Sequence, residues 1–451
     1  MLKIYNTANK KVEPFKPYGE VVKVYTCGPT VYSFPHIGNY AAYIYWDLLI
    51  RTLKMNEFKV RRVLNFTDVG HLVSDGDEGE DKFEKGARKE GKSVYEIAKF
   101  YGDDFLRNFR ALNLVEPEVI AHATDYIEAD MKAVDKMTAS GFTYEIRDGI
   151  YYDTTKFSKY ADFARLDLAG LQAGARVDFS NEKRNVSDFA VWKFIQPGEK
   201  HTMRWDYLGR PGYPGWHLEC STIIHEELGE PIDIHTGGID HIPIHHTNEI
   251  AQTYAMTGKE LARYWMHCDF ITIDGEKISK SLGNVYTLDD LKERGFSPMD
   301  YKMWALSGHY QGARNFTFES LEASRQRRLN WRNQIALLYQ NNISQNNSRN
   351  KCDFNKIISA VNNNLNSAEA FAVIDTSVLD MADWEKVDEL FGLNLIKDTP
   401  DIDDNIKTLI DERQNARKNK NFARSDEIRE QLKSSGITVE DTPNGPVWQY
   451  I

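Results

Sequence analysis

The chain has 451 residues, which is too long for a single hydrophobic core and favours about three domains. Hydrophobic residues make up 41% and charged residues 27% of it, a balance typical of globular proteins that argues against intrinsic disorder. The net charge of −11 argues against a uniformly basic nucleic-acid binder, although a local basic face is enough to bind phosphates.

The sequence also indicates where the protein works. No run approaches the roughly 18 apolar residues of a membrane helix, and the start, "MLKIYNTANKK", lacks the apolar stretch of a secretory signal. The cysteines are too widely spaced for a disulfide scaffold; they are Cys27, Cys220, Cys268 and Cys352. We therefore expect a cytoplasmic protein with free thiols and no membrane segment.

The first predicted elements are a strand, a helix and a second strand. Residues 21–27, "VVKVYTC", are a β-branched run that predicts a strand. Residues 36–55 place apolar side chains at helical spacing, and residues 58–68 predict another strand. Strand, helix and strand in this order favour a parallel α/β sheet.

The middle of the chain changes pattern twice. Residues 85–140 are mostly helical in pattern, whereas 148–163 begin a β-rich, irregular insertion that runs to the Gly- and Pro-rich loops of 204–216. The α/β pattern then resumes in three segments, which are 217–228, 231–240 and 271–284.

Helical patterning dominates from about residue 317 onward. The Asn-rich residues 340–355 predict a loop or linker. Residues 423–451 predict a helix, a strand, a turn and a strand, with Asn444-Gly445 as the hairpin signal.

Two stretches in this part are locally basic, with aromatic residues nearby. They are 325–334 and 413–433. Each can be a solvated helix face or a nucleic-acid contact, and the residues leave both alternatives open.

Two short motifs favour phosphate binding. In "FPHIGN", His36 and Asn39 lie three apart at the start of the predicted helix, and Gly38 lets a ligand approach backbone N–H groups that favour anions. In "GEKISKSLGN", Lys277 and Lys280 flank a serine in a Gly-bounded loop, and lysines are mobile charges suited to phosphates. Each motif alone has an ordinary structural explanation, but together, each beside a strand, they indicate a nucleotide site.

A third group of residues favours a metal ion. Cys27 ends a strand, Cys220 lies in "GWHLECST", and "HHTNEIAQ" places His245 and Glu249 four apart on one face of a helix. Two thiols, an imidazole and a carboxylate suit Zn²⁺. Other histidines compete for this role, and residue chemistry alone does not choose among them; they are His217, His235, His241 and His246.

"HIGN" and "KISKS" resemble the two signature motifs of class I aminoacyl-tRNA synthetases, with Asn39 and Ile278 as mild departures. "HTGGID" resembles that family's Gly-Gly-x-Asp segment, where small residues let adenine and ribose pack against backbone. The resemblance implies catalytic roles on the phosphates for His36, Asn39, Lys277 and Lys280. It implies an ATP site formed by His36, Gly38, Asn39, Gly237, Gly238 and Lys280.

Four motifs together, "TCGPTVYSFPHIGN", "GWHLECS", "HTGGID…HHTNEIAQ" and "KISKSLGN", resemble the cysteinyl-tRNA synthetases. The resemblance implies one Zn²⁺ per subunit on Cys27, Cys220, His245 and Glu249. It implies that the substrate amino acid contacts Gly28, Thr30, Thr67, Trp216 and Asp240. Serine differs from cysteine by one atom, and shape alone gives about 10–200-fold selectivity for such differences. Zinc prefers a thiolate to a hydroxyl, so ligation can supply what packing cannot.

Two features stand beside this resemblance. The family commonly reads Asn-x-Thr-Asp-x-Asp-Asp-Lys after the second strand, but Gly70 and His71 replace the acidic pair here, which puts the role of those carboxylates in doubt. The C-terminal segment resembles the family's anticodon-binding end. Its candidate RNA contacts, by phosphate pairing and base stacking, are Arg417, Arg424, Arg429 and Trp448.

The resemblance implies an α/β fold, with a Rossmann-type parallel-sheet catalytic domain that carries an insertion, then a helical bundle and a small α+β C-terminal anticodon-binding domain. We expect the catalytic domain at 1–115 and 216–270 and the insertion at 116–215. The expected boundaries of the rest are 271–330 for the KISKS loop and stem-contact region, 331–398 for the bundle and 399–451 for the anticodon-binding domain.

The implied activity is ligation of L-cysteine to tRNA(Cys). ATP, accompanied by Mg²⁺, would activate cysteine as cysteinyl-adenylate, and the 3′-terminal ribose of the tRNA would then take the cysteinyl group. Such chemistry depends on positioning and charge stabilisation. We expect a monomer.

Two other functions remain open at this stage. The cysteine ligase of mycothiol synthesis resembles the same catalytic core but joins cysteine to an amino sugar, and the basic C-terminal module argues against it. A synthetase-like protein that binds without catalysis is the other, and the intact metal and phosphate motifs argue against it.

Overall fold

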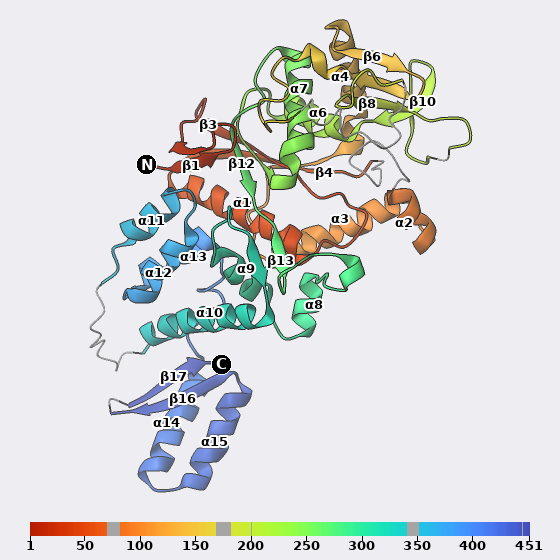
Figure 1. Cartoon of the computed structure of the whole chain (residues 1–451). Coiled ribbons are helices and arrows are strands. Elements are labelled where there is room, and N and C mark those ends of the chain that lie inside the picture. Colours follow the sequence, from red (N-terminus) through yellow and green to blue (C-terminus); the bar gives the residue numbers. More distant parts are fainter. Residues whose placement is uncertain (70–81, 168–181, 200, 341–350, 444) are drawn as a thin grey trace.

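Figure 1 shows the computed structural model of the chain, which describes residues 1–69, 82–167, 182–199, 201–340, 351–443 and 445–451. A parallel sheet with its helices forms the centre. An antiparallel sheet lies at one end of the molecule, and the C-terminal module lies at the other, beyond a long helix. Within the described residues, no helix is both long and apolar enough to cross a membrane.

The central sheet has five strands in the order β12-β11-β3-β4-β5, and every neighbouring pair is parallel. The strands are β3 (Val21–Thr26), β4 (Lys59–Phe66), β5 (Val119–His122), β11 (Ile232–Gly238) and β12 (Ala262–Cys268). The predicted parallel α/β fold is therefore confirmed. β3 has β4 on one side and β11, from much later in the chain, on the other. The strand order reverses at this point, and open α/β sheets bind ligands beside such a reversal.

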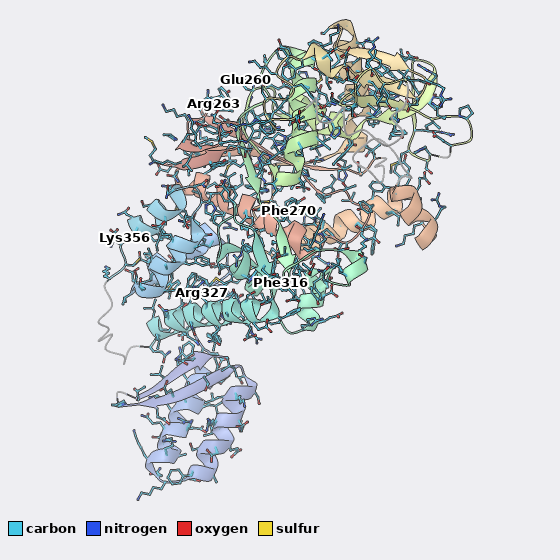
Figure 2. All side chains as sticks on the ribbon, viewed as in Figure 1. Glu260, Arg263, Phe270, Phe316, Arg327 and Lys356 are labelled. Atoms are coloured by element: carbon cyan, nitrogen blue, oxygen red, sulfur yellow. The ribbon has the colours of Figure 1, made fainter. Side chains whose placement is uncertain are left out.

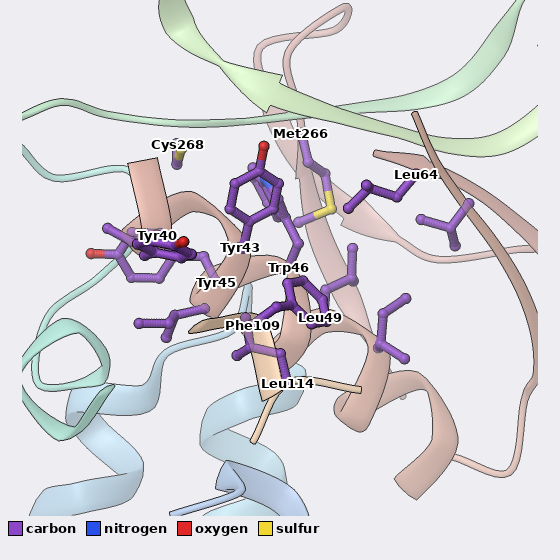
Figure 3. Packing of buried hydrophobic residues seen from close by; sticks show 14 of the residues in the cluster. Tyr40, Tyr43, Tyr45, Trp46, Leu49, Leu64, Phe109, Leu114, Met266 and Cys268 are labelled. Carbon is purple, nitrogen blue, oxygen red and sulfur yellow. The ribbon is translucent and has the colours of Figure 1, made fainter. Parts of the chain in front are cut away.

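The helices around this sheet come from the chain segments before and after the insertion. They are α1 (Ile37–Met55), α2 (Lys82–Glu90), α3 (Val94–Ala111), α4 (Ile127–Ala139), α6 (Trp216–Glu227) and α7 (Thr247–Thr257). α1 supplies much of the core: Figure 3 shows its aromatic side chains, from Tyr40 to Trp46, gathered beneath Met266 and Cys268 of β12. The region 85–140, expected to be mostly helical, also contributes β5, because Val119–His122 pairs with β4.

The insertion forms an antiparallel sheet in the order β6-β7-β8-β10-β9. Its strands are β6 (Thr143–Ile146), β7 (Gly149–Tyr152), β8 (Phe189–Phe194), β9 (Trp205–Tyr207) and β10 (Arg210–Pro214). A hairpin that the sequence patterns did not indicate, β1 (Lys3–Asn6) with β2 (Lys11–Pro14), lies beside the edge strand β12, where Thr7 N donates to the carbonyl of Trp265.

A second small sheet, in the order β14-β13-β15, carries the KISKS segment. It consists of β13 (Ile271–Ile273), β14 (Glu276–Lys277) and β15 (Arg314–Phe316). Helices follow: α8 (Leu288–Glu293), α9 (Pro298–Leu306), α10 (Phe318–Leu338), α11 (Phe354–Asn362), α12 (Ser367–Thr376) and α13 (Met381–Phe391). Short helical turns occupy Ala123–Tyr126, Thr154–Lys156, Ile239–His241, Ile242–His246 and Lys280–Leu282.

The C-terminal module contains α14 (Asp404–Lys418), α15 (Phe422–Ser434), β16 (Ile437–Thr442) and β17 (Gly445–Tyr450), with the two strands antiparallel. The predicted order of helix, strand, turn and strand is confirmed, although Asn444 of the turn lies outside the described residues. The predicted linker likewise falls mainly on 341–350, which the structure does not describe.

The starts of several helices follow from local hydrogen bonding. α8, α9 and α10 each begin with a capping box, in which a Ser or Thr side chain bonds the backbone three residues on and that residue's side chain bonds back. The pairs are Thr287 with Asp290, Ser297 with Asp300, and Thr317 with Ser320.

Candidate active site and metal centre

The sequence motifs meet at the carboxyl ends of β3 and β11, where the strand order reverses. Cys27 follows β3 directly, and its N–H donates to the carbonyl of Thr236 on β11. Gly237 and Gly238 end β11 itself. Parallel strands end at one edge of the sheet, so residues about 210 apart in sequence come together there.

The turn after Cys27 lies tightly against β4. Gly28 N donates to Asn65 Oδ1 at 2.8 Å, and a Cβ on Gly28 would lie 1.5 Å from the Asn65 carbonyl oxygen. Thr30 and Thr67 then pair as an isolated bridge. Only glycine fits this approach, and it fixes the position of the Cys27 thiol relative to the sheet.

The predicted metal donors converge. One donor atom each of Cys27, Cys220, His245 and Glu249 lie within 4.8 Å of one another. Cys220 and Glu249 are buried on α6 and α7, and His245 lies in the turn before α7. Glu249 Oε1 is buried without a hydrogen-bond partner, although His245 Nε2 lies 2.8 Å away. Two thiols, an imidazole and a carboxylate that converge in this way are the donor types that Zn²⁺ prefers, so these residues fit a zinc ion.

The geometry also brings together a second set. One donor atom each of Cys27, Glu249, His235 and His246 also lie within 4.8 Å of one another. His235 Nε2 hydrogen-bonds Glu249 Oε2 at 2.6 Å, and its ring stacks on Trp265 with centroids 4.5 Å apart. His246 Nε2 lies 3.4 Å from Cys27 Sγ. The competition among histidines that the sequence left open therefore persists in the geometry.

Electrostatics distinguish the donors. A hydrogen bond from Cys27, against the effect of burial, lowers the pKa of Cys220 to about 6, whereas burial raises the pKa of Cys27 well above its usual value. Burial opposes ionisation of Glu249, but His235 and His245 outweigh it and hold the pKa of the carboxyl below its normal range. The site thus favours one thiolate and one carboxylate. Against the effect of burial, Glu249 and Cys220 raise the pKa of His245, so binding of a metal there would displace a proton from the imidazole.

Two further groups surround these donors. Trp216, at the start of α6, stacks on His245 with ring centroids 4.7 Å apart. His217 Nδ1 and His245 Nδ1 share a hydrogen bond of 2.9 Å. The neighbours of His245 on α6 therefore set the orientation of its ring. Residues behind a metal ligand usually have this orienting role.

The predicted phosphate site lies at the start of α1. His36 is its N-cap: His36 Nδ1 accepts from Asn39 N at 3.2 Å, and Asn39 Oδ1 accepts from His36 N at 3.0 Å. This capping box leaves His36 Nε2 and Asn39 Nδ2 as the atoms it does not use. Burial and the nearby Lys280 lower the pKa of His36, which favours the neutral form of the imidazole.

The KISKS loop touches this helix start. A Cβ on Gly38 would lie 2.7 Å from Ile278 Cδ1, so glycine allows the two motifs to approach. Asn284 braces the loop, because its side chain accepts from Ser279 N and donates to the carbonyl of Lys277. The exposed Lys277 and Lys280 therefore project from a loop held against α1.

The Gly-Gly-x-Asp segment lies at the end of β11, next to the candidate metal donors. A Cβ on Gly237 would lie 2.7 Å from His246 and 2.8 Å from His241, whereas one on Gly238 would meet the Asp240 carboxylate at 2.3 Å. Asp240 itself is exposed in the turn after β11. The glycines thus remove side chains where backbone, histidines and an acidic group crowd together.

Residue patterns did not reveal several functional neighbours. His267 on β12 lies opposite Gly237, shares a 2.8 Å hydrogen bond with His246 and another with Thr7. Its position depends on strand register, which no local motif encodes. Behind the metal donors, Asp130 and Glu219 are buried with all four carboxylate oxygens unpartnered, and burial raises the pKa of Asp130 to about 8.

The segment after β4 is described only in part. Thr67 is buried and accepts from Asn65 Nδ2, and Asp68 accepts from Thr124 N and its hydroxyl. Gly70 and His71, where the sequence departs from the resembled pattern, lie outside the described residues.

The candidate RNA contacts in the C-terminal module differ in how exposed their side chains are. Arg417 and Arg429 are exposed, and Arg417 pairs with Asp441. Arg424 pairs with Glu412 and Glu427. Trp448 is 6% exposed and packs in the module's apolar core, so its expected role in base stacking is wrong, because a stacking ring must offer an open face.

Comparisons with known proteins agree with this site. The family model for the tRNA synthetase class I (C) catalytic domain matches residues 14–326, and the model for the cysteinyl-tRNA ligase anticodon binding domain matches 399–450. The cysteine–tRNA ligase 1 of Burkholderia lata is 42% identical over 98% of this chain and 96% of its own length. That of Treponema denticola is 37% identical over the whole of both chains.

Among solved structures, the methionyl-tRNA synthetase of Mycobacterium tuberculosis in complex with methionyl-adenylate is similar in fold. Its TM-score is 0.57 over 84% of this chain and 89% of that one, at 16% identity.

Proposed function

The chain belongs to the cysteine–tRNA ligase family, and from this premise we propose how its own residues perform the family's reaction. The activity is ATP-dependent ligation of cysteine to tRNA by a class I synthetase. The amino-sugar alternative has no use for an anticodon-binding module, and the match at 399–450 does not favour it. The observation that carries the proposal is the juxtaposition of a thiol-rich metal centre with the HIGN and KISKS motifs.

The metal centre is proposed to hold one Zn²⁺ on Cys27, Cys220, His245 and Glu249. This set contains both thiols, whereas the second set replaces Cys220 and His245 with His235 and His246. His235 and His246 already have partners that suit a supporting role: the first holds Glu249 Oε2, and the second joins Cys27 to His267. Bound there, zinc would favour a thiolate ligand over a hydroxyl and so distinguish cysteine from serine.

The amino-acid end of the site is proposed to include Trp216 and Asp240. Trp216 stacks on a proposed metal ligand, so its ring would lie against the substrate side chain. Asp240 is an exposed carboxylate beside the Gly237-Gly238 backbone and would hold the substrate ammonium or the ribose. Gly28, Thr30 and Thr67 would line the same pocket from the side of β3 and β4.

At the other end, ATP with Mg²⁺ is proposed to lie between α1 and the KISKS loop. Gly38, Gly237 and Gly238 would let the nucleotide approach the backbone. His36 Nε2 and Asn39 Nδ2 would donate to phosphate oxygens, together with the backbone N–H of Gly38 in the first turn of α1. The cysteine carboxylate attacks the α-phosphorus, and Lys277 and Lys280 would stabilise the charge that develops on the leaving pyrophosphate.

The tRNA is proposed to span the molecule, with its 3′ end at the adenylate and its anticodon on the C-terminal module. Arg417, Arg424 and Arg429 are the proposed phosphate contacts there. A monomeric state and a cytoplasmic location belong to the same proposal. So do the expected domain boundaries, except that β5 (Val119–His122) belongs to the central sheet, so the insertion begins after it and not at residue 116.

The test offers purified protein ATP and cysteine with tRNA(Cys), with an amino sugar, or with no acceptor. We expect covalent transfer of labelled cysteine to tRNA alone. Transfer to the amino sugar would favour the rival ligase. Binding of cysteine without AMP formation under any condition would mean that the protein is not an enzyme of this class.

A further inference from the structure

The basic stretch 325–334 on α10 is not explained by the function above. Arg328 is 6% exposed and pairs with the carboxylates of Asp398 and Asp300. Arg332 donates to the carbonyl of Asp398 and to Thr399 Oγ1. These two arginines bind the segment of chain that leads into the C-terminal module. Arg328 and Arg332 therefore serve as contacts within the protein and are not available as an open RNA surface.

Two side-chain amides extend these contacts along α10. Asn333 Nδ2 donates to the carbonyl of Tyr450 at 3.3 Å, and its Oδ1 accepts from Tyr450 N at 2.9 Å. Gln340, just beyond the end of α10, does the same with Trp448, at 3.0 and 3.1 Å. Each amide offers the backbone of β17 one donor and one acceptor, as a neighbouring strand would.

These bonds fall on the edge of β17 that faces away from its partner strand. β16 pairs with β17 in antiparallel register, and alternate residues of such a strand direct their N–H and C=O groups to opposite sides. Trp448 and Tyr450 are two apart, so both present their backbone groups at the outer edge. An exposed strand edge is a ready template for pairing, and here α10 occupies it.

α10 is also anchored to the catalytic side. Trp304 Nε1 of α9 donates to Ser320 Oγ at 2.8 Å, and the Phe318 ring meets Phe316 and Tyr286 edge-on. The carbonyl of Tyr286 accepts from Ile37 N at the start of α1. Twenty-one helical residues span roughly 31 Å. One helix thus runs from the neighbourhood of the phosphate site to β17, and Figure 2 marks Phe316 before its start and Arg327 along it.

We propose that Asn333 and Gln340 are positioning residues, which fix the anticodon-binding module on α10 at the orientation that presents the tRNA 3′ end to the adenylate. The inference rests on the proposed function, because it assigns the two amides a role in tRNA charging. The apolar contacts of Trp448 and Ala336 hold the module near the helix, but such contacts have no direction. The four amide bonds do have direction, so they set the module's rotation.

The test uses the full-length double variant Asn333→Leu/Gln340→Met, whose side chains keep the native size but cannot hydrogen-bond. The matched control is Asn330→Leu, one turn earlier on α10, where the exposed Asn330 amide accepts only from Gln326 in the contacts described. Three quantities are measured: cysteine-dependent pyrophosphate exchange, the Kd for an RNA hairpin with the anticodon stem and loop, and kcat/KM for charging whole tRNA.

We expect exchange and hairpin binding to stay within about twofold of the native values, because the site and the module are intact. Charging of whole tRNA should fall about 10–100-fold, since a misplacement of about 1 Å can cost that much. The control should charge normally, and each single variant should fall between.

Two results would overturn the inference. Normal charging by the double variant would show that the amides position nothing. A loss of hairpin binding as large as the loss of charging would show that they only keep the module folded. If the native protein itself charges no tRNA, the failure belongs to the proposed function instead.

Discussion

The candidate metal centre and the C-terminal module differ in how their charged groups are buried and paired. At the candidate metal centre, buried and partly buried donors converge on one another, and burial and charge displace their pKa values. In the module, charged side chains are mostly exposed and paired with neighbours. Metal donors act through the ion they bind, whereas paired surface groups can function without a ligand. We therefore expect substitutions at the first to abolish activity and substitutions at the second to adjust it.

The largest effect should separate two adjacent histidines. His245→Asn should lose zinc and lower cysteine-dependent exchange by at least about 100-fold, because the ion contributes several kcal/mol of charge stabilisation. His246→Asn should keep about one zinc per chain at saturating zinc, because it removes a supporting group. Zinc content by atomic absorption and exchange rates on folded protein check this. Zinc loss by His246→Asn alone would select the second donor set.

We expect the second-largest effect from a substitution in the KISKS loop. Lys280→Ala should reduce the maximal rate of exchange about 100-fold or more, with a small change in KM for ATP, because a charge that acts on the leaving group is used mainly in the transition state. Glu276→Ala, on the same exposed hairpin, should exchange at the native rate. A rise in KM for ATP without a fall in rate would show that Lys280 only binds the nucleotide.

A third experiment asks whether the metal centre depends on backbone geometry. Gly28→Ala should destabilise the protein by several kcal/mol or shift the Cys27 turn, because its Cβ would meet the Asn65 carbonyl. Gly19→Ala, where a Cβ meets nothing within 4 Å, should stay within about 0.5 kcal/mol. Urea unfolding measures both. Equal stability of the two variants would contradict the close approach at Gly28.

In the C-terminal module, Arg429→Ala should weaken tRNA charging only several-fold and lower the salt dependence of tRNA binding by about one unit of slope. Exchange should not change, since α15, which carries Arg429, lies in the C-terminal module, separated from the central sheet by α10 (Figure 1). An exchange defect in this variant would remove the contrast between the two regions.

The smallest effect concerns pH. Arg413 donates to both oxygens of Asp441 and lowers the pKa of this carboxyl, so the pair stabilises the fold above the unfolded pKa near 4 and is lost as pH falls through the folded value. Asp441 is 37% exposed, so we expect about 0.5–1 kcal/mol. The difference in unfolding free energy between native protein and Asp441→Asn should shrink from pH 5 to pH 3. A constant difference would mean that the pair contributes nothing.

The same contrast explains what the sequence can predict. The convergence of Cys27 with Cys220 and the N-cap position of His36 were predictable, because thiols that suit a metal and a residue that begins a helix both belong to short local motifs. His267, Thr7 and the contacts of Asn333 and Gln340 with β17 depend on strand register and on contacts between segments far apart in the chain, which no local pattern encodes. The burial of Trp448 also depends on such distant contacts, because a tryptophan near the end of a chain has the same local sequence pattern whether its ring is buried or exposed.

The central claim is that a metal centre selects the thiol of the substrate. The most direct measurement is pyrophosphate exchange with cysteine and with serine, on protein loaded with zinc and on the same protein after chelation. We predict exchange with cysteine at least about 1,000-fold above serine when zinc is bound, more than shape alone provides, and loss of the cysteine signal after chelation with recovery on adding zinc back. Unchanged selectivity in the metal-free protein would contradict the account and assign the choice of cysteine to the pocket around Trp216.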